Sequence, residues 1–404
     1  MTLGIGGSTA EQEIARLTSV RDRAQPIGEA EYRERLQKLR QSMDAEAVDS
    51  VFLSASTSLR YFTGLQCYPS ERLHGAIVPR SGELIYVCPR FEEAKTISEI
   101  VLLGDFLLWE EHESPTQAVV ERVLNCLNGA SGRLAIDDQT PFFIASRLQE
   151  SSAKLQIVNA ESMIAECRRI KSQAEIRLLS QAKEITMRIQ QAAARILREG
   201  IDTREVQAFL DAAHLACGTD GRSTFKIVLF GEATAYPHGV PYPQTLREGD
   251  MVLIDTGATL HGYNSDITRS YVFGEADSLQ REIWQLERQA QAAAFSAAQI
   301  GAPCSAPDDA ARAVIEAAGF GPGYEVPGLP HRTGHGVGLD VHEHPYIVRG
   351  NELKLAAGMC FSIEPMICLY GEFGVRLEDH AYMTESGPCW FTEPSPELER
   401  PFAN

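Results

Sequence analysis

The sequence lacks the features that usually place a protein on a nucleic acid, in a membrane or in the secretory route. Its formal net charge is −18, whereas nucleic acids and anionic membranes both attract surfaces rich in Lys and Arg. The N-terminus has no basic stretch followed by an apolar one, as a signal peptide would have. The most apolar run, residues 100–109, contains Asp105 and is too short to span a bilayer. We therefore expect no nucleic-acid partner and no membrane contact.

Paired cysteines are also missing. The nine cysteines include no CxxC pair, and their odd number and wide spacing argue against a disulfide framework. Most are expected to be small buried apolar residues, and the reducing cytoplasm is the expected location. With 44% hydrophobic and 23% charged residues, the composition is that of a globular protein. A length of 404 residues favours two domains.

Strands alternate with helices in the first part of the chain. Residues 1–27 are polar and predict a loose arm or a short helix. Helical patterns follow at 29–47 and 115–129, and apolar segments predict strands within 48–55, 74–90, 105–111, 133–140 and 154–160. This alternation predicts an α/β domain over residues 28–158.

The remaining residues, 159–404, have a different pattern. Residues 160–199 are rich in strong helix formers and predict two helices that meet near Ser172. A helix-rich stretch then precedes a strand pair near 250–273, and another precedes a strand pair near 358–384. This order of helices followed by a strand hairpin indicates a weak internal duplication.

Each of the two strand pairs carries two acids. Asp255 lies in an apolar strand and Asp266 follows eleven residues later, while Glu364 and Glu378 are fourteen residues apart in the second pair. A hairpin can bring such acids side by side on one sheet face, where like charges repel and are costly to bury without compensation. Divalent cations, which prefer oxygen ligands, are the usual compensation.

Residues 331–345 read HRTGHGVGLDVHEHP and contain four histidines. The stretch is rich in glycine and ends at a proline, so it is not the HExxH helix of zinc proteases. One histidine together with four acids suits a pair of metal ions, which stabilise a bridging hydroxide and a developing oxyanion. A single acid near a strand end more often faces solvent, so the hypothesis depends on the joint pattern.

These motifs resemble a known family. The series DTG, SDITR, GHGVG with a histidine seven residues on, IEP and VRLED is similar to that of the pita-bread metallopeptidases, which include aminopeptidase P, prolidase and methionine aminopeptidase. The resemblance covers residues 165–395. It implies a creatinase-like α/β N-terminal domain followed by an α+β pita-bread catalytic domain, the creatinase/aminopeptidase fold. Methionine aminopeptidases generally lack the first domain, which favours the other two.

The resemblance implies five metal ligands. Asp255 would hold one ion, Asp266 and Glu378 would bridge two ions, and His335 and Glu364 would complete the second. Glu364 would also be the general base that activates the bridging water. The implied cofactors are two divalent ions, Mn²⁺ or Zn²⁺ with Co²⁺ as a third candidate, because ligand type alone does not select among them.

The resemblance also suggests roles for residues around these ligands. His342 would stabilise the oxygen of the attacked carbonyl, His331 would line the pocket for the proline side, and His238 would contact substrate or assist proton transfer. Arg376 would position a ligand or the substrate. Each also has a purely structural interpretation, as a packed histidine or, for Arg376, as an ion pair with a neighbouring acid.

Arg332 occupies a position where many prolidases carry a small residue. Its guanidinium could clamp a substrate carboxylate through two hydrogen bonds, or it could be an exposed arginine. The other polar residues near the motifs are expected to support the site, pack, cap or face solvent; these are Asp340, His344, Asp379 and His380.

The resemblance implies a dinuclear metal-dependent peptidase that cleaves Xaa-Pro bonds in small peptides, and an Xaa-Pro dipeptidase (prolidase) is favoured. No arginine lies between Glu364 and Arg376, where some prolidases carry their dipeptide-selecting arginine, so aminopeptidase P stays open. A non-peptide C–N hydrolase is a further alternative, although creatinase lacks the metal ligands. A non-catalytic binding protein on this fold would be expected to have lost ligands. The family also implies a homodimer.

Overall fold

The computed structural model describes residues 4–151 and 153–402 and divides into two compact units. One unit runs from Ile27 to Arg168, and the other combines the segment up to Pro26 with the chain from Arg169 onward. As expected, most cysteines are buried, six of the nine. Among the described residues, no helix combines the length and the apolar character needed to cross a membrane.

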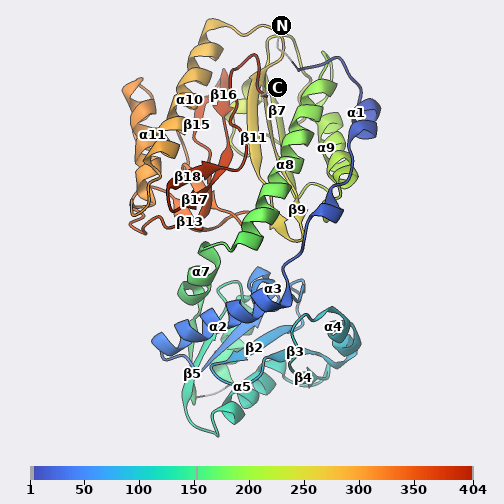
Figure 1. The fold of residues 1–404 in the computed structure, drawn as a ribbon, viewed down its shortest axis with the longest axis vertical. Coiled ribbons are helices and arrows are strands. Elements are labelled where there is room, and N and C mark those ends of the chain that lie inside the picture. Colours follow the sequence, from blue (N-terminus) through green and yellow to red (C-terminus); the bar gives the residue numbers. More distant parts are fainter. Residues whose placement is uncertain (1–3, 152, 403–404) are drawn as a thin grey trace. The chain divides into compact units, whose positions relative to one another are not determined.

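The first unit is built on a mixed sheet of six strands in the order β4-β3-β2-β1-β5-β6 (Figure 1). β2 pairs antiparallel with β1 and β3, and the remaining pairings are parallel, which requires crossover connections. The strands are β1 (Ser50–Ser54), β2 (Gly75–Pro79), β3 (Ile85–Pro89), β4 (Asp105–Trp109), β5 (Gly132–Ile136) and β6 (Leu155–Asn159). All the strands predicted from the sequence in this part are present.

Helices supply the other half of this unit's core. They are α2 (Glu29–Ala45), α3 (Thr57–Thr63), α4 (Glu93–Glu99), α5 (Pro115–Cys126), α6 (Phe142–Glu150) and α7 (Glu161–Arg169), with a 3₁₀ turn, η2 (Arg90–Glu92). Apolar side chains of α5 and α6 pack against those of the central strands, for example Val119 and Leu148 with Phe52 and Ile77. The sequence patterns missed the short helices α3, α4 and α6, which are 7 to 9 residues long and show too few turns for a clear period.

Helix α7 is tied to the first unit. The Tyr61 hydroxyl donates a hydrogen bond to the Cys167 carbonyl at 2.8 Å, and Arg168 Nη1 lies 3.3 Å from the Thr57 hydroxyl. The compact units accordingly divide after Arg168, whereas the sequence analysis placed its expected domain boundary between residues 158 and 159.

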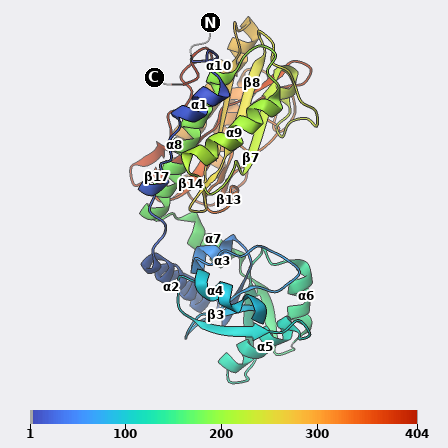
Figure 2. The same ribbon diagram turned by 90° about the vertical axis from the view of Figure 1, so that its right-hand side faces the viewer.

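The second unit contains two pairs of helices. α8 (Gln173–Ile196) packs on α9 (Thr203–Cys217), and α10 (Ser278–Ala297) packs on α11 (Ser305–Ala317). A capping box between Ser172 and Glu175 starts α8, so two helices do meet near Ser172 as predicted. The arm contributes α1 (Ala10–Arg16), which lies against α8 and α9 (Figure 2), followed by a 3₁₀ turn, η1 (Arg21–Arg23).

The strands of the second unit form two main sheets. One has the order β11-β8-β7 and the other β13-β12-β14-β17-β18, and two further pairs are β9 with β10 and β15 with β16. The strands are β7 (Phe225–Phe230), β8 (Met251–Gly257), β9 (Thr259–Leu260), β10 (Tyr263–Asn264), β11 (Ile267–Val272), β12 (Gly334–Gly336), β13 (Glu343–Ile347), β14 (Cys360–Ile363), β15 (Met366–Leu369), β16 (Phe373–Arg376), β17 (Asp379–Thr384) and β18 (Gly387–Trp390), with a 3₁₀ turn, η3 (Gly231–Ala235), after β7. The two strand pairs that carry the acids thus belong to different sheets.

Candidate metal centre

The first acid-bearing strand pair is a regular antiparallel ladder. β8 runs against β11, and the last pair of the ladder joins Thr256 to Ile267. Asp266 therefore lies one residue beyond the ladder, across from Gly257. Because residues 255 and 257 face the same side of a strand, Asp255 and Asp266 are diagonal neighbours. Gly257 is needed here, since a Cβ at this position would lie 1.9 Å from the backbone oxygen of Ser265.

The second pair opens where its acids lie. β14 and β17 pair antiparallel, but Glu364 comes directly after β14 and Glu378 directly before β17. The sequence analysis placed both glutamates inside strands. The ladder stops because their backbone N–H groups are used elsewhere: that of Glu364 donates to the Thr333 carbonyl at 2.7 Å, and that of Glu378 to the Thr268 carbonyl at 3.2 Å. The chain between them forms the separate pair of β15 and β16.

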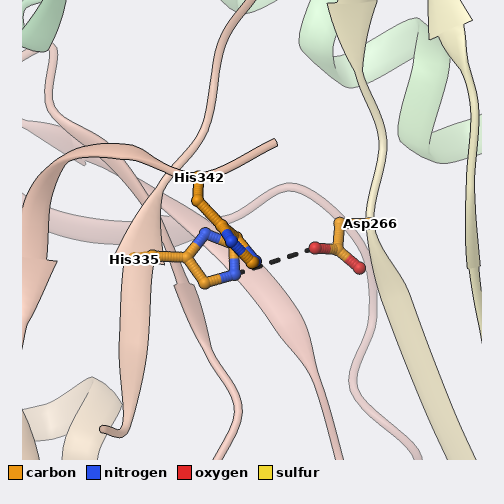
Figure 3. A group of neighbouring side chains, drawn as sticks. All are labelled: Asp266, His335 and His342. Carbon is orange, nitrogen blue, oxygen red and sulfur yellow. Dashed lines mark ion pairs between the residues drawn. The ribbon is translucent and has the colours of Figure 1, made fainter. Parts of the chain in front are cut away.

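His335 comes from the short strand β12 and points its Nε2 at the acids. Nε2 lies 3.0 Å from Glu364 Oε1. It also lies 3.7 Å from Asp266 Oδ2 (Figure 3). Its Nδ1 is 3.0 Å from the carbonyl oxygen of Gly336 and donates its N–H there. Nε2 donates to Glu364 when the ring is charged, and loss of that proton frees Nε2 to bind a metal. The His342 ring lies beside it, with 4.1 Å between ring centroids.

Four of the five predicted ligands lie close together. Three groups have ligand atoms that are all within 4.8 Å of one another: Asp266 with His335 and His342, Asp266 with Glu378 and His380, and His335 with Glu364 and Glu378. Asp255 belongs to none of these groups. Its Oδ2 accepts a hydrogen bond from Arg376 Nη2 at 2.6 Å, while its buried Oδ1 accepts none from any described residue.

Burial and mutual repulsion control the charges in this cluster. Burial raises the pKa of Asp266 and of Glu378 well above their ordinary values, and neighbouring carboxylates add to both shifts. Burial also raises the pKa of Asp255, against the opposing charge of Arg376. Glu364 differs: burial acts to raise its pKa, but the charge of His335 and its hydrogen bond outweigh this and bring the pKa to about 2. The cluster therefore has more carboxylates than cationic side chains, and divalent cations would supply the missing positive charge.

Side chains from each strand pair hold the acids of the other. Arg376, at the end of β16, donates to Asp255 on β8 and, through Nε, to the Thr268 hydroxyl at 3.1 Å. Thr268, on β11, in turn donates to Glu378 Oε2 at 2.7 Å. The other oxygen of Glu378 lies 3.2 Å from His380 Nε2. The acids are thus oriented by a chain of bonds that crosses between the two sheets.

All five predicted ligands line one cavity of about 510 Å³. His342, His238 and Arg376 line it as well. Burial, followed by the charge of His335, lowers the pKa of His342 to about 4, so its ring is neutral at neutral pH. The cavity therefore contains acids, neutral imidazole and one cation in a single space.

Two predicted substrate residues are placed differently. His331 and Arg332 are not among the residues that line this cavity. His331 is held by its neighbour, with Nδ1 2.7 Å from the Arg332 carbonyl oxygen, and burial lowers its pKa. The Arg332 guanidinium lies over the Tyr346 ring, 4.4 Å from its centroid, but is close enough for its charge to lower the pKa of His342.

Sequence reasoning missed Arg269, a residue that supports the cluster. Arg269 is fully buried and forms an ion pair with Asp379 at 2.6 Å, and its Nη1 donates to the Glu378 carbonyl at 2.8 Å. Asp379, expected to support the site or face solvent, is fully buried. A charged residue at an interior position of an apolar strand, as Arg269 is in SDITRSYVF, was the available signal, because such residues are seldom buried without a partner.

Buried carboxylates and a histidine around one cavity are typical of metal-dependent enzymes. Residues 177–385 match the model of metallopeptidase family M24, and residues 35–170 match the creatinase/prolidase N-terminal domain. The chain therefore belongs to metallopeptidase family M24 and has the pita-bread fold with a creatinase-type N-terminal domain, which confirms the fold class expected from the sequence. The family is metal-dependent, and the cluster is its possible metal site.

Individual relatives span nearly the whole chain. An Xaa-Pro dipeptidase of Lactobacillus delbrueckii subsp. lactis is 33% identical over 371 residues, covering 90% of this chain and 98% of that protein. The crystal structure of dipeptidase PepE from Mycobacterium ulcerans aligns with a TM-score of 0.85 and 32% identity, over 93% of this chain and 99% of that one. The structure of an X-Pro aminopeptidase from Thermotoga maritima aligns with a TM-score of 0.77 and 25% identity, over 90% and 98% of the two chains.

Proposed function

We propose that this chain is an Xaa-Pro dipeptidase, a prolidase, whose active site holds two divalent cations. The observation that carries the proposal is the single cavity lined by all five candidate ligands together with His342 and His238. The similarity to an Xaa-Pro dipeptidase over 90% of the chain supports the same substrate class. Small peptides that contain an Xaa-Pro bond are the proposed substrates.

The donor set fits two cations. Four carboxylates and one imidazole suit Mn²⁺, Zn²⁺ or Co²⁺, and Asp255 Oδ1 is buried with no hydrogen bond from a described residue. Asp255, Asp266, His335, Glu364 and Glu378 would together hold the ions. When bound, such ions would provide a nucleophilic hydroxide at neutral pH and stabilise negative charge on the attacked oxygen.

The surrounding side chains manage protons and charge. Glu364, with a pKa of about 2, is ionised at neutral pH and accepts the proton of the attacking water. His342 is neutral and donates an N–H to the carbonyl oxygen as that oxygen gains charge. His238, on the cavity wall, contacts the substrate or assists transfer of the proton to the leaving proline nitrogen, and His331 borders the proline side.

Arg332 is the proposed reader of the dipeptide carboxylate. Its guanidinium packs on the Tyr346 ring, and its charge acts on His342 at the cavity. An arginine binds a carboxylate through two parallel hydrogen bonds. We expect Arg332→Ala to raise KM for Ala-Pro while leaving kcat nearly unchanged, because the variant loses only the contact to the substrate carboxylate.

The test is hydrolysis of Ala-Pro, Ala-Pro-Ala and creatine by the purified chain, with Mn²⁺, with Zn²⁺ and after chelation. Cleavage of Ala-Pro alone, lost on chelation, is the expected result. Cleavage of the tripeptide as well would make the chain an aminopeptidase P, and turnover of creatine would make it a non-peptide C–N hydrolase. A homodimer in the cytoplasm is the proposed state, which light scattering and cell fractionation would check.

A further inference from the structure

Behind the first acid-bearing strand pair lies a buried glutamine on helix α8. Gln190 is 0% exposed, and its Nε2 donates to two backbone carbonyls, those of Ile254 at 3.0 Å and Ile267 at 2.9 Å. Ile254 immediately precedes Asp255, and Ile267 immediately follows Asp266. One side-chain nitrogen therefore joins the two strands at the level of their acids.

Behind the second strand pair, helix α10 presents the same residue in the same role. Gln291 is also 0% exposed, and its Nε2 lies 3.1 Å from the Leu377 carbonyl and 3.4 Å from the Ile363 carbonyl. Leu377 precedes Glu378, and Ile363 precedes Glu364. A third acceptor, Asp379 Oδ2, is 3.1 Å from the same nitrogen.

Glutamine is the side chain that this geometry requires. Its amide nitrogen carries two hydrogens and no charge, so it can join two carbonyls without placing a buried cation behind the acids. Neither Gln190 Oε1 nor Gln291 Oε1 accepts a hydrogen bond from a described residue. A flipped amide would point oxygen at two carbonyl oxygens, so the contacts fix each orientation.

Each of the two helices carries a second buried polar residue at the same spacing. Residues four apart share a helix face. Four residues before Gln190, the Thr186 hydroxyl lies 2.7 Å from that of Ser265, the neighbour of Asp266. Four residues before Gln291, Glu287 is fully buried, and neither of its carboxyl oxygens has a hydrogen-bond partner among the described residues. Each half of the second unit thus brings one polar helix face against the backbone of its own acids.

We propose that Gln190 and Gln291 are a matched pair of amide clamps that fix the backbone on which the four carboxylates are mounted and so set their positions for metal binding. The inference rests on the proposed metal centre. Three of the four clamped carbonyls belong to the peptide group directly before a ligand, so their rotation would turn the Cα–Cβ bond of that ligand. Both glutamines are positioning residues, and neither lines the cavity.

The experiment removes the amides and measures metal binding. Full-length chain is stripped with chelator and titrated with Mn²⁺ by calorimetry, and the electron paramagnetic resonance spectrum of the bound ion is recorded. The clamp variants are Gln190→Met and Gln291→Met, which keep side-chain length but donate nothing. The controls are Gln173→Met and Gln289→Met, exposed glutamines on the same two helices.

We expect the clamp variants to bind Mn²⁺ about 10- to 100-fold more weakly, the usual loss when a group that orients a metal ligand is removed, with an altered spectrum. The controls should match the wild type. Gln190→Glu and Gln291→Glu serve if the methionine variants do not fold, because a buried glutamate is protonated and still donates one hydrogen; an intermediate loss is expected.

Clamp variants that fold and bind with wild-type affinity and spectrum would overturn the clamp assignment alone. If only the glutamate variants fold, wild-type Mn²⁺ affinity and spectrum in them would likewise overturn the clamp assignment. A wild-type chain that binds no Mn²⁺ would overturn the proposed metal centre and the clamp assignment with it. The two failures are therefore separated by the wild-type titration.

Discussion

The two acid-bearing strand pairs reach the same cavity by different means. In the first, Asp255 sits within a regular strand and its charge is met by the guanidinium of Arg376 at 2.6 Å. In the second, Glu364 and Glu378 lie where the ladder is interrupted, and imidazole and hydroxyl groups orient them: His335, the Thr268 hydroxyl and His380. The backbone of Asp255 is held in the ladder, whereas the backbones of Glu364 and Glu378 are held by hydrogen bonds outside it.

The comparison also shows that neither pair is complete alone. Arg376, from β16 between the two strands of the second pair, serves the first pair, while Thr268 belongs to the first pair and serves the second. The acids of both pairs are thus oriented only when the two sheets are docked. Variants that remove the Arg376–Asp255 bond or the Thr268–Glu378 bond should show how much each contributes to stability and to metal binding.

The largest effect is expected from Arg376→Met, which removes the cation and leaves Asp255 buried without its partner. Breaking a buried ion pair costs about 3–5 kcal/mol, so the free energy of unfolding of the chelated protein should fall by that order. Denaturant unfolding monitored by circular dichroism measures it. Adding Asp255→Asn should restore much of the loss, since it removes the unpaired charge. A double variant as unstable as the single one would show that Arg376 acts through packing.

The next largest effect is expected from Glu378→Gln, which should weaken metal binding but stabilise the metal-free protein. Loss of a proposed metal ligand should weaken Mn²⁺ binding at least about 100-fold, the upper end of what loss of a group behind a ligand costs. The chelated protein should become more stable, because burial and repulsion no longer act on a carboxylate at this site. Calorimetric titration and thermal unfolding give the two quantities. Glu287→Gln, at a fully buried acid away from the cavity, should raise stability without weakening Mn²⁺ binding.

The stability of the metal-free protein should depend on pH through the buried acids of both strand pairs. A carboxyl whose folded pKa is raised adds stability that is fully present below its unfolded pKa and is lost as pH rises through the folded value. Glu378, raised from 4.5, and Asp266, raised from 3.8, should therefore make the chelated protein less stable as pH increases above about 4.5. The Mn²⁺-loaded protein should lack this decline, and Glu378→Gln should reduce it. Equal slopes for chelated and loaded protein would contradict the assignment of the acids as ligands.

Much of the fold could be predicted from local sequence. The strands of the first unit, the helix break at Ser172 and the acid-bearing hairpins all have strong short-range signals, namely apolar runs, a cap and glycine turns. Edge strand β7 was missed because nothing in FKIVLF marks it as the partner of a strand that begins over twenty residues later. Pairing over such a distance is decided by tertiary packing, which a single sequence does not display.

The candidate site was predictable as a residue set but not as a bonding pattern. Five ligand candidates follow from motif order. The sequence cannot reveal that Arg376 bonds to Asp255 on a strand of another sheet, or that Arg332 packs on Tyr346. It also did not indicate Gln190 and Gln291, because glutamine is a common helix residue and becomes informative only once its burial and its acceptors are known. Because every residue has a backbone carbonyl, a side chain that binds carbonyls has no partner residue type or spacing by which the sequence could identify it.

The smallest effect should come from Thr268→Val, which keeps the shape of the side chain. It removes the hydroxyl that accepts from Arg376 and donates to Glu378. Leaving the buried Glu378 oxygen and Arg376 Nε without this partner should cost about 1–3 kcal/mol of unfolding free energy. Thr256→Val is the matched control, because Thr256 is equally buried and donates only to the Phe225 carbonyl. Both variants should lose stability, but only Thr268→Val should weaken Mn²⁺ binding, since only that hydroxyl orients a ligand. Equal Mn²⁺ affinities in the two variants would mean that Glu378 is oriented by His380 and its backbone alone.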